Sequence, residues 1–294
     1  MKVISFKENG FCAGVQRIIE LLMQLDHECK KVYILGEIVH NRIVNDSFKE
    51  KGVEFILIGV DFYKKLEALD KKESILVIGA HGIPKHIKNH LKEKSFTVID
   101  GTCSIVKNVF KEINESKGKN IFFFGKPGHQ EFISAISYSL TDPNIVTVDK
   151  NGSPEISFDK YLPNIDSVLI AQTTMNSEDY LSIKGKIEKK LDTKVDLKMT
   201  ICPIVRKVEK NIASIKPAKN TIAFVVGSKT SSNTSKIYFS LLKLGVNVRF
   251  IEDKSEIHHD DLIGIKKTYL FGGTSTPNKT IDEVREFLVL LRDQ

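Results

Sequence analysis

Three cysteines that lie far apart in the chain each open a similar segment. The segments are CAGVQRIIELL from Cys12, CSIVKNVFKEI from Cys103 and CPIVRKVEKNI from Cys202. Valine is the third residue after each cysteine, and apolar residues recur at offsets of six, seven and ten, except that Glu209 occupies offset seven of the third copy. This spacing predicts an amphipathic helix with the cysteine at its N-terminus. A β-type segment, KVISF, FTVID or KVDLKMTI, precedes each cysteine.

The distances between these cysteines indicate that one unit is used three times. Successive cysteines are 91 and 99 residues apart, and two further landmarks recur in register. In each copy an apolar strand ends in glycine, and a polar residue follows four positions later: His40, His129 and Ser231. A later apolar strand in each copy leads to a second polar residue: His81, Thr173 and Ser275. We therefore expect three α/β units, over residues 1–95, 96–193 and 194–294.

Each unit is expected to be a small doubly wound α/β domain, because strand and helix patterns alternate along it. Ligands of such folds bind beyond the carboxyl ends of the strands, which is where the cysteines and the polar landmarks fall. Three such ends about a pseudo-threefold axis would bring three cysteines and several polar side chains into one central cavity. The predicted fold class is therefore α/β, with three small domains related by a pseudo-threefold axis around an active site.

The charge pattern argues against a nucleic-acid-binding protein. The 294 residues carry a formal net charge of +7, but basic and acidic residues alternate in runs such as KKLEALDKKE. Nucleic-acid binding normally needs the positive charge gathered on one face, whereas an acidic protein partner is compatible with this pattern. No run of eighteen apolar residues is present, and the N-terminus lacks the pattern of a secretory signal. We expect a cytoplasmic protein that does not enter a membrane.

Three converging cysteines would suit an iron–sulfur cluster. A helix N-terminus favours the thiolate form of cysteine, which is the form that binds metal. Cubane clusters normally take four cysteines, so three would hold three irons and leave the fourth iron open. Zinc bound by three cysteines is the alternative, but it would leave the nearby histidines and hydroxyls without an evident purpose. Cys29, in DHECKK, has no counterpart in the other copies and is expected to be an ordinary small apolar residue.

The polar residues at the same strand ends indicate what the cavity would bind. Hydrogen-bond donors at loop ends and helix starts are the groups that hold phosphate oxygens. We therefore expect a diphosphate group at His40, His81, Ser231, Ser232, Asn233 and Ser275. Glu131, two residues after His129, is the only acid among these landmarks. A shielded carboxyl at this position could donate a proton, with Thr173 as a relay.

With these residues in hand, the chain resembles the 4-hydroxy-3-methylbut-2-enyl diphosphate reductases, which catalyse the last step of the methylerythritol phosphate route to isoprenoids. The likeness covers nearly the whole chain. It rests on GFCAGV around Cys12, VHN at 39–41, HG at 81–82, the TC of Cys103, H-x-E at 129–131, QTT at 172–174, TIC ending at Cys202 and VVGSKTSSN at 225–233. The resemblance implies a trefoil of three α/β domains around a [4Fe-4S] cluster that Cys12, Cys103 and Cys202 hold.

The resemblance also implies roles for the other landmarks. The diphosphate would bind to His40, His81, Ser231, Asn233 and Ser275, with His129 and Ser232 also lining the pocket. Glu131, helped by Thr173, would protonate the allylic hydroxyl, which would leave as water. Two electrons from outside would then yield isopentenyl and dimethylallyl diphosphates. An acidic ferredoxin or flavodoxin fits a net-basic enzyme as the electron donor.

One departure and two alternatives accompany this interpretation. Gln130 stands where proline is usual in these reductases, and the loss of proline's fixed φ could loosen the aim of Glu131. Another trefoil iron–sulfur enzyme with three cysteines, such as a quinolinate-synthase-like lyase, would share the fold. A nucleic-acid-binding regulator that uses the cluster as a sensor is the alternative from a different class. The SSN triplet at 231–233 and the pair of His129 and Glu131 favour the reductase.

Overall fold

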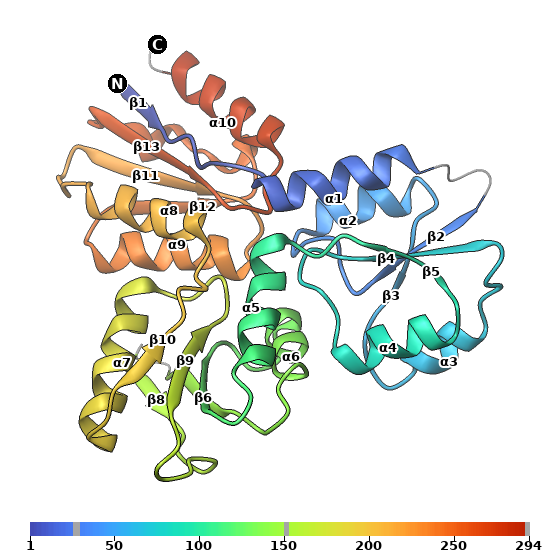
Figure 1. Ribbon diagram of the computed structural model, residues 1–294. Coiled ribbons are helices and arrows are strands. Elements are labelled where there is room, and N and C mark those ends of the chain that lie inside the picture. The colour runs from blue at the N-terminus through green and yellow to red at the C-terminus, as the bar shows by residue number, and fades with distance from the viewer. Residues whose placement is uncertain (26–29, 150–152, 292–294) are drawn as a thin grey trace. The chain divides into compact units, whose positions relative to one another are not determined.

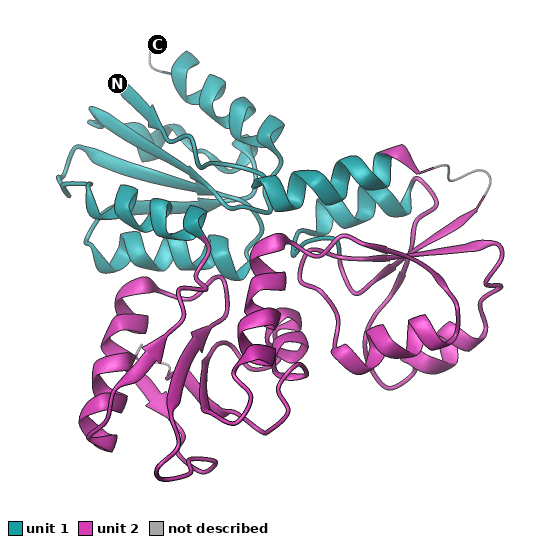
Figure 2. Cartoon of the chain, viewed as in Figure 1, with its two compact units in different colours: residues 1–23, 38–50, 203–294 teal, residues 24–37, 51–202 magenta. Residues whose placement is uncertain are grey.

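The computed structural model describes residues 1–25, 30–149 and 153–291, so Cys29 lies outside the described residues (Figure 1). The chain divides into two compact units (Figure 2). The first unit comprises residues 1–23, 38–50 and 203–294, and the second comprises residues 24–37 and 51–202. Within the described residues the strands form three sheets, one in the first unit and two in the second.

The sheet of the first unit has four parallel strands in the order β1-β13-β11-β12. Helices α8 and α9 cover one face through Val208, Ile237 and Leu241, and α10 covers the opposite face through Ile281 and Val284. The strands are β1 (Lys2–Ser5), β11 (Thr221–Val226), β12 (Asn247–Ile251) and β13 (Lys267–Gly272). The helices are α1 (Ala13–Gln24), α2 (Arg42–Lys49), α8 (Pro203–Ala213), α9 (Ser232–Lys243) and α10 (Asn278–Leu290), with short 3₁₀ helices η1 (Lys254–Glu256) and η2 (His259–Leu262).

The second unit contains two sheets. The first has the order β3-β2-β4-β5, all parallel, from β2 (Lys31–Leu35), β3 (Glu54–Ile56), β4 (Ser74–Ile78) and β5 (Thr97–Asp100). The second has the order β10-β9-β6-β7-β8, from β6 (Asn120–Phe124), β7 (Asn144–Val148), β8 (Pro154–Ile156), β9 (Ser167–Ala171) and β10 (Val195–Leu197). Only β8 runs antiparallel to its neighbour among these described strands.

Helices pack on the sheets of the second unit through their apolar stripes. Helices α3 (Phe62–Glu67) and α4 (Lys85–Glu93) pack on the first sheet through residues such as Phe62 and Ile87. Helices α5 (Ser104–Glu115) and α6 (Gln130–Ile136) pack on the second sheet through Val109 and Phe132, and α7 (Ser177–Leu191) follows β9. The strands β6 and β9 are buried along their whole length, as NIFFF and SVLIA lead one to expect of parallel strands covered on both faces.

The strand before each cysteine joins the sheet of the preceding repeat. Strand β5 pairs with β4, β10 pairs with β9, and β1 pairs with β13. The three sheets therefore share one pattern, in which the strand before a cysteine lies at the edge beside the last strand of the copy before it. The sequence pattern places this strand in the same unit as the helix that follows it, whereas in the structure the strand pairs with the preceding copy. A β-type pattern predicts a strand but does not predict its partner, which the crossover connection determines.

The predicted α/β class and the threefold repetition of its pattern are confirmed by these sheets. The boundaries at 95/96 and 193/194 stay a prediction, because each repeat shares its first strand with the sheet before it. Within the described residues, no helix combines the length and the apolar character that crossing a bilayer requires.

Tyr180 on α7 provides a test of how the second sheet is held to the segment that leads to Cys202. Its side chain is fully buried, and its hydroxyl lies 2.6 Å from the carbonyl oxygen of Leu169 and 2.7 Å from that of Lys198. Tyr180→Phe removes the donor to both carbonyls and should lower the free energy of unfolding by about 1–3 kcal/mol, measured by urea denaturation. Tyr63→Phe, at a side chain 38% exposed, should change it little, and equal losses would contradict this role.

Candidate active site

Each of the three cysteines lies directly before a helix, as the sequence predicts. Cys12 precedes α1, Cys103 is the N-cap of α5 and Cys202 precedes α8, and all three side chains are half-buried. The backbone N–H of each cysteine donates to a carbonyl oxygen in the loop after the last strand of the preceding copy. The three bonds run from Cys12 to Thr274 (3.4 Å), from Cys103 to Ala80 (3.1 Å) and from Cys202 to Thr173 (2.9 Å). One backbone interaction therefore fixes all three cysteines in the same way.

In the first unit, two asparagines hold the loop that carries Cys12. The side chain of Asn9 donates to the carbonyl of Leu270 at 2.8 Å and accepts from the N–H of Gly272 at 3.0 Å. Asn278 accepts from the N–H of Phe11 at 3.0 Å. Gly10 has φ of +81°, and a Cβ there would lie 2.1 Å from Oδ1 of Asn278, so only glycine allows this close approach. Neither asparagine is predicted from the sequence, because a lone asparagine does not indicate its distant hydrogen-bond partner.

A chain of polar contacts in the first unit connects several predicted substrate-binding residues. Ser231 is the N-cap of α9, and its hydroxyl lies 3.1 Å from that of Ser275. Both serines are buried. The side chain of Asn41, which is the N-cap of α2, donates to the carbonyl of Ser275 at 2.9 Å, and that of Asn233 donates to the hydroxyl of Thr274 at 3.2 Å. The structure therefore brings Ser231, Asn233 and Ser275 together.

Two further predicted residues belong to this unit. Ser232 is the first residue of α9, and His40 lies next to Asn41; both are half-buried. Asn41 was not among the predicted site residues, although the VHN segment and the helix that begins after it were signals for an N-cap asparagine. Together with Cys12, Ser231, Asn233 and Ser275, His40 and Ser232 are the predicted site residues that lie in the first unit.

In the second unit, Glu131 is a buried acid near the start of α6. Only 1% of its surface is exposed. Its Oε1 accepts from the backbone N–H of Thr173 at 2.7 Å, and its Oε2 accepts from the Thr173 hydroxyl at 2.8 Å. Burial raises the pKa of Glu131 to about 7, although both hydrogen bonds from Thr173 oppose the rise. Near neutral pH this carboxyl therefore exists in both protonation states, which suits a proton donor.

Thr173 connects this acid to a cysteine. Its N–H and its hydroxyl both serve Glu131, while its carbonyl accepts from the N–H of Cys202. The preceding residue, Gln172, is also buried, and its Oε1 accepts from the N–H of Lys126 at 3.0 Å in the loop that leads to His129. The QTT segment therefore fixes the loop of the acid and the loop of Cys202 against each other.

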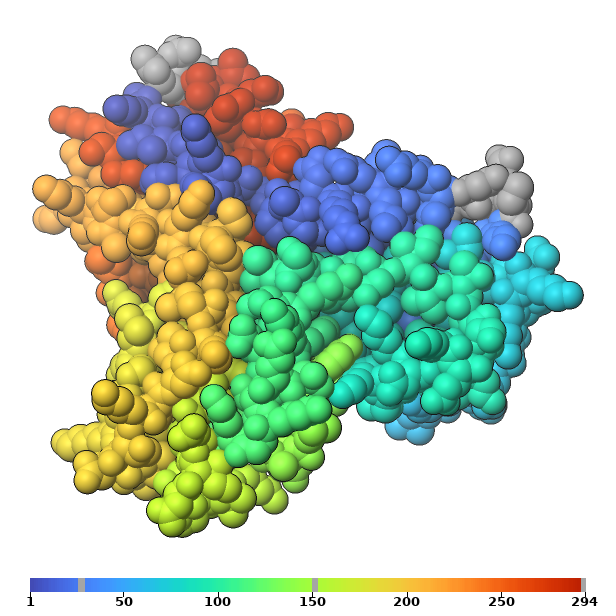
Figure 3. Space-filling view, in the orientation of Figure 1, coloured from blue at the N-terminus to red at the C-terminus, as the bar shows by residue number. Residues whose placement is uncertain are grey.

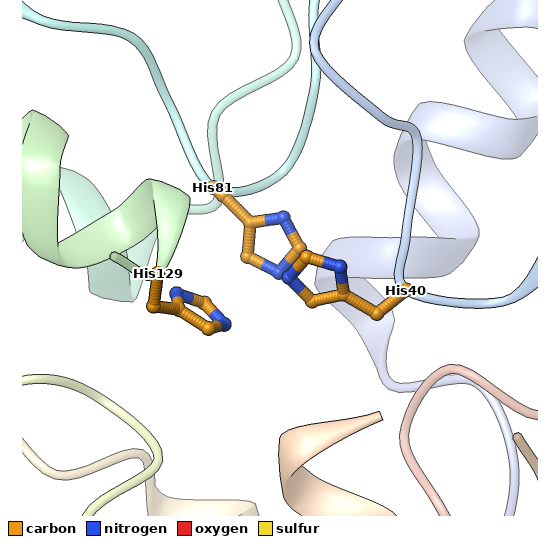
Figure 4. Close-up of side chains that lie close together, drawn as sticks. All are labelled: His40, His81 and His129. Carbon is orange, nitrogen blue, oxygen red and sulfur yellow. The ribbon is translucent and has the colours of Figure 1, made fainter. Parts of the chain in front are cut away.

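The histidines of the second unit lie beside this acid. His129 is the N-cap of α6, and its Nδ1 accepts from the N–H of Glu131 at 3.1 Å. The rings of His81 and His129 meet edge to face, with centroids 5.2 Å apart (Figure 4). Their loops follow β4 of one sheet and β6 of the other. The second unit therefore brings together His81, His129, Glu131 and Thr173 from two different sheets.

Gln130 strengthens this junction between the two sheets. Its Nε2 donates to the carbonyl of Gly82 at 2.8 Å, one residue after His81. A Cβ on Gly36, which has φ of +89°, would lie 2.5 Å from Oε1 of Gln130, so the amide occupies space that only glycine leaves open. Gln130 is also the first residue of α6, where proline is well tolerated. In place of the rigid φ of proline, the glutamine therefore supplies a hydrogen bond between the two loops.

Parallel sheets that carry cysteines, histidines and a buried carboxyl of near-neutral pKa at the carboxyl ends of their strands define an α/β enzyme. The chain belongs to the LytB protein family, whose model matches residues 3–289. It is 31% identical over 293 residues to the 4-hydroxy-3-methylbut-2-enyl diphosphate reductase of Kosmotoga olearia. The matched region covers 98% of this chain and 95% of that relative.

Two solved structures share the fold. The E-1-hydroxy-2-methyl-but-2-enyl-4-diphosphate reductase of Plasmodium falciparum superposes with a TM-score of 0.78 at 24% sequence identity. The match covers 98% of this chain and 87% of that enzyme's chain. A second structure, of (E)-4-hydroxy-3-methyl-but-2-enyl diphosphate reductase, described as the terminal enzyme of the non-mevalonate pathway, matches 98% and 99% with a TM-score of 0.66 and 26% identity. The predicted oxidoreductase family and fold class are confirmed, and the reductase prevails over the quinolinate-synthase-like lyase.

The pKa of Glu131 predicts how protein stability depends on pH. Because the native pKa of about 7 lies above the ordinary value of 4.5, the native state binds an extra proton between these values. The free energy of unfolding should therefore fall as pH rises through this window, by about 2 kcal/mol between pH 5.5 and 8. Glu131→Gln should remove this part of the pH dependence, measured by urea denaturation at both pH values. Glu93→Gln, at an exposed carboxyl, should retain it, and an unchanged slope in Glu131→Gln would contradict the raised pKa.

The hydrogen bond of Gln130 gives a separate prediction. Gln130→Ala should lower the free energy of unfolding by about 1 kcal/mol, because the bond to Gly82 is lost. Gln130→Pro loses the same bond but fixes φ at the first position of α6, so it should be less destabilised than Gln130→Ala. Gln16→Ala, on an exposed face of α1, is the matched control in the same urea measurement. If Gln130→Ala and Gln16→Ala behaved alike, the bond would have no structural importance.

Proposed function

We propose that this chain reduces (E)-4-hydroxy-3-methylbut-2-enyl diphosphate to isopentenyl and dimethylallyl diphosphates. The net reaction consumes two electrons and two protons, breaks the allylic C–O bond and releases water. The observation that carries the proposal is the buried carboxyl of Glu131, whose pKa is near 7 and whose partner Thr173 also bonds to Cys202. An acid fixed next to a predicted metal ligand is the arrangement that protonation of a leaving hydroxyl requires. The family to which the chain belongs supports the same reaction.

A [4Fe-4S] cluster bound to Cys12, Cys103 and Cys202 is part of the proposal. The residues fit such a group, because all three thiols are half-buried and each lies at a helix N-terminus, where thiolates are favoured. When bound, the cluster would supply an open iron as a Lewis acid and a carrier for single electrons. A [4Fe-4S] cluster is a better candidate for these three cysteines than a zinc ion. The redox reaction of the family needs an electron carrier, and zinc has no redox chemistry.

The diphosphate group is proposed to bind to the hydrogen-bond donors at the strand ends. His40, His81, Ser231, Asn233 and Ser275 are the proposed contacts, with His129 and Ser232 also in the pocket. Support comes from Ser231, because it caps α9, and a helix N-terminus offers N–H groups and a positive dipole end to an anion. The buried hydroxyls of Ser231 and Ser275 bond to each other at 3.1 Å, so they are already oriented before a substrate arrives.

Glu131 is proposed to hold the proton that leaves with the substrate hydroxyl. When Glu131 is neutral, its O–H can donate to Oγ1 of Thr173, whose own hydroxyl proton is then available to a substrate oxygen. After transfer the carboxylate keeps two donors, the N–H and the hydroxyl of Thr173, which limit the energetic penalty of the buried charge. Glu131 and Thr173 thus act as a single acid. The two electrons would come from an acidic ferredoxin or flavodoxin, which the net charge of +7 favours.

An anaerobic assay tests this proposal. The cluster-loaded protein, a reduced viologen dye and the hydroxymethylbutenyl diphosphate should yield both products. Glu131→Gln should keep the visible absorption of the cluster and lose turnover by about 10²–10⁴-fold, which is the usual contribution of a general acid. Thr173→Val should also reduce turnover. Wild-type activity in Glu131→Gln would remove this residue from the mechanism.

The cysteines are tested separately by iron content and absorption spectra. Cys12→Ser, Cys103→Ser and Cys202→Ser should each lose most of the iron after anaerobic reconstitution. Cys29→Ser is the matched control and should load normally. A normally loaded Cys103→Ser would show that the ligand set is wrong, whatever the activity of the wild-type protein.

A further inference from the structure

A second feature of the second unit is a cleft lined by lysines. It has a volume of about 470 Å³ and lies between α4 and α5, beside the residues that follow α6. Its cationic residues are Lys85 and Lys88 on α4 and Lys107 and Lys111 on α5. In Figure 3 the cleft lies between the green atoms of α5 and the teal atoms of α4. None of these residues belongs to the proposed active site.

The cations of this cleft exceed the acids that contact them. Asp100 accepts from Lys88 at 2.9 Å and lies 3.3 Å from Lys107, and Glu115 lies 3.9 Å from Lys111. Within the part of the chain that the structure describes, the four lysines thus have two carboxylates as ion-pair partners. The side chains of Lys88, Lys107 and Lys111 remain 51%, 43% and 64% exposed, so these ion pairs are weak and the ammonium groups can meet other anions.

The centre of the cleft is aromatic. The rings of Phe110 and Tyr138 stack, with centroids 4.4 Å apart and planes inclined by 10°. The ammonium of Lys85 lies 5.9 Å from the centroid of Tyr138 and donates to Oδ1 of Asn114 at 3.1 Å. An apolar centre with a polar rim is the usual anatomy of a protein–protein interface.

The cleft is also close to a proposed cluster ligand along α5. Lys107, Phe110 and Lys111 follow Cys103 by four, seven and eight residues, so they lie on one face of the helix with it. The N–H of Lys107 donates to the carbonyl of Cys103 at 2.9 Å. The cleft therefore begins one helical turn, about 6 Å of rise, from this cysteine. A carrier bound there would face a short path for electrons.

We propose that this cleft is the docking site for an acidic electron-carrier protein. The inference rests on the proposed function, because a reductase needs electrons from a donor. A protein carrier fits better than nucleic acid, because the cleft begins one helical turn from a proposed cluster ligand and its four lysines do not form a continuous basic stripe. A free phosphate fits less well, because the N–H of Lys85 at the start of α4 already donates to the hydroxyl of Ser137 at 2.8 Å.

Charge reversal tests the docking site. The double variant Lys88→Glu and Lys111→Glu should weaken binding of an acidic [2Fe-2S] ferredoxin at least tenfold, measured by isothermal titration calorimetry on the cluster-loaded protein at low salt. It should also reduce the dependence of the dissociation constant on sodium chloride. Lys88→Gln with Lys111→Gln, which perturbs folding less, should weaken binding severalfold. The matched control, Lys160→Glu with Lys279→Glu, changes the net charge equally at exposed sites outside the cleft and should bind ferredoxin within twofold of wild type.

Two electron sources separate this proposal from the proposed function. With ferredoxin as donor, the cleft variant should lose turnover, while with reduced viologen it should match wild type. Equal ferredoxin affinity in the cleft variant and the control would overturn the docking site. If an RNA oligomer lost affinity on charge reversal while ferredoxin did not, the cleft would be a nucleic-acid site and the proposal would be wrong. A wild-type protein inactive with viologen would instead refute the proposed reaction, and the ferredoxin titrations would still decide the docking site.

Discussion

The proposed site depends on one backbone hydrogen bond that occurs three times. In each copy the N–H of the cysteine donates to a carbonyl oxygen in the loop that follows the neighbouring parallel strand. The strand before each cysteine is parallel to its neighbour, so its last residue and the neighbour's following loop lie at the same edge of the sheet. After a short connection, the N–H of the cysteine donates to a carbonyl of that loop, and the helix begins directly after the cysteine. Its unsatisfied N–H groups and dipole act on the thiol. Parallel pairing therefore sets both the position of each cysteine and its tendency to ionise.

The pKa of Glu131 also depends on the hydrogen bonds at one of these loops. Burial alone would favour the neutral carboxyl strongly, whereas two donors from Thr173 favour the charged form, and the balance leaves the pKa of Glu131 at about 7. Thr173 holds this balance because its carbonyl is fixed by the N–H of Cys202. Movement of the Cys202 loop would therefore alter the hydrogen bonds to the acid. Thr173 therefore links the proposed proton donor to the proposed metal ligand.

Local patterns in the sequence predicted the parts of this molecule that repeat. Offsets after Cys12, Cys103 and Cys202 predicted three helices, which the structure has. The isolated acid at Glu131 led to the prediction of a proton donor there, which stays a prediction. Sheet membership was beyond such reasoning, because a β-type pattern carries no information about the partner strand. The links of Asn9, Asn278 and Gln130 were also missed, since each joins residues remote in sequence. From the sequence, Gln130 in place of proline was expected to loosen the aim of Glu131. The structure adds that the Gln130 amide donates to the carbonyl of Gly82, a contact that the sequence does not reveal.

The three copies agree at their cysteines and differ along the helices that follow. At offsets four and eight, α1 has Gln16 and Glu20, which bond to each other at 2.9 Å, and so offers no cation there. In α8 offset seven is Glu209, which forms an ion pair with Lys236 at 2.6 Å. Among these three helices, only α5 combines lysines at offsets four and eight with an aromatic residue between them. The shared cysteines suit the proposed cluster, and the divergence gives α5 the lysines and the aromatic residue of the proposed docking cleft.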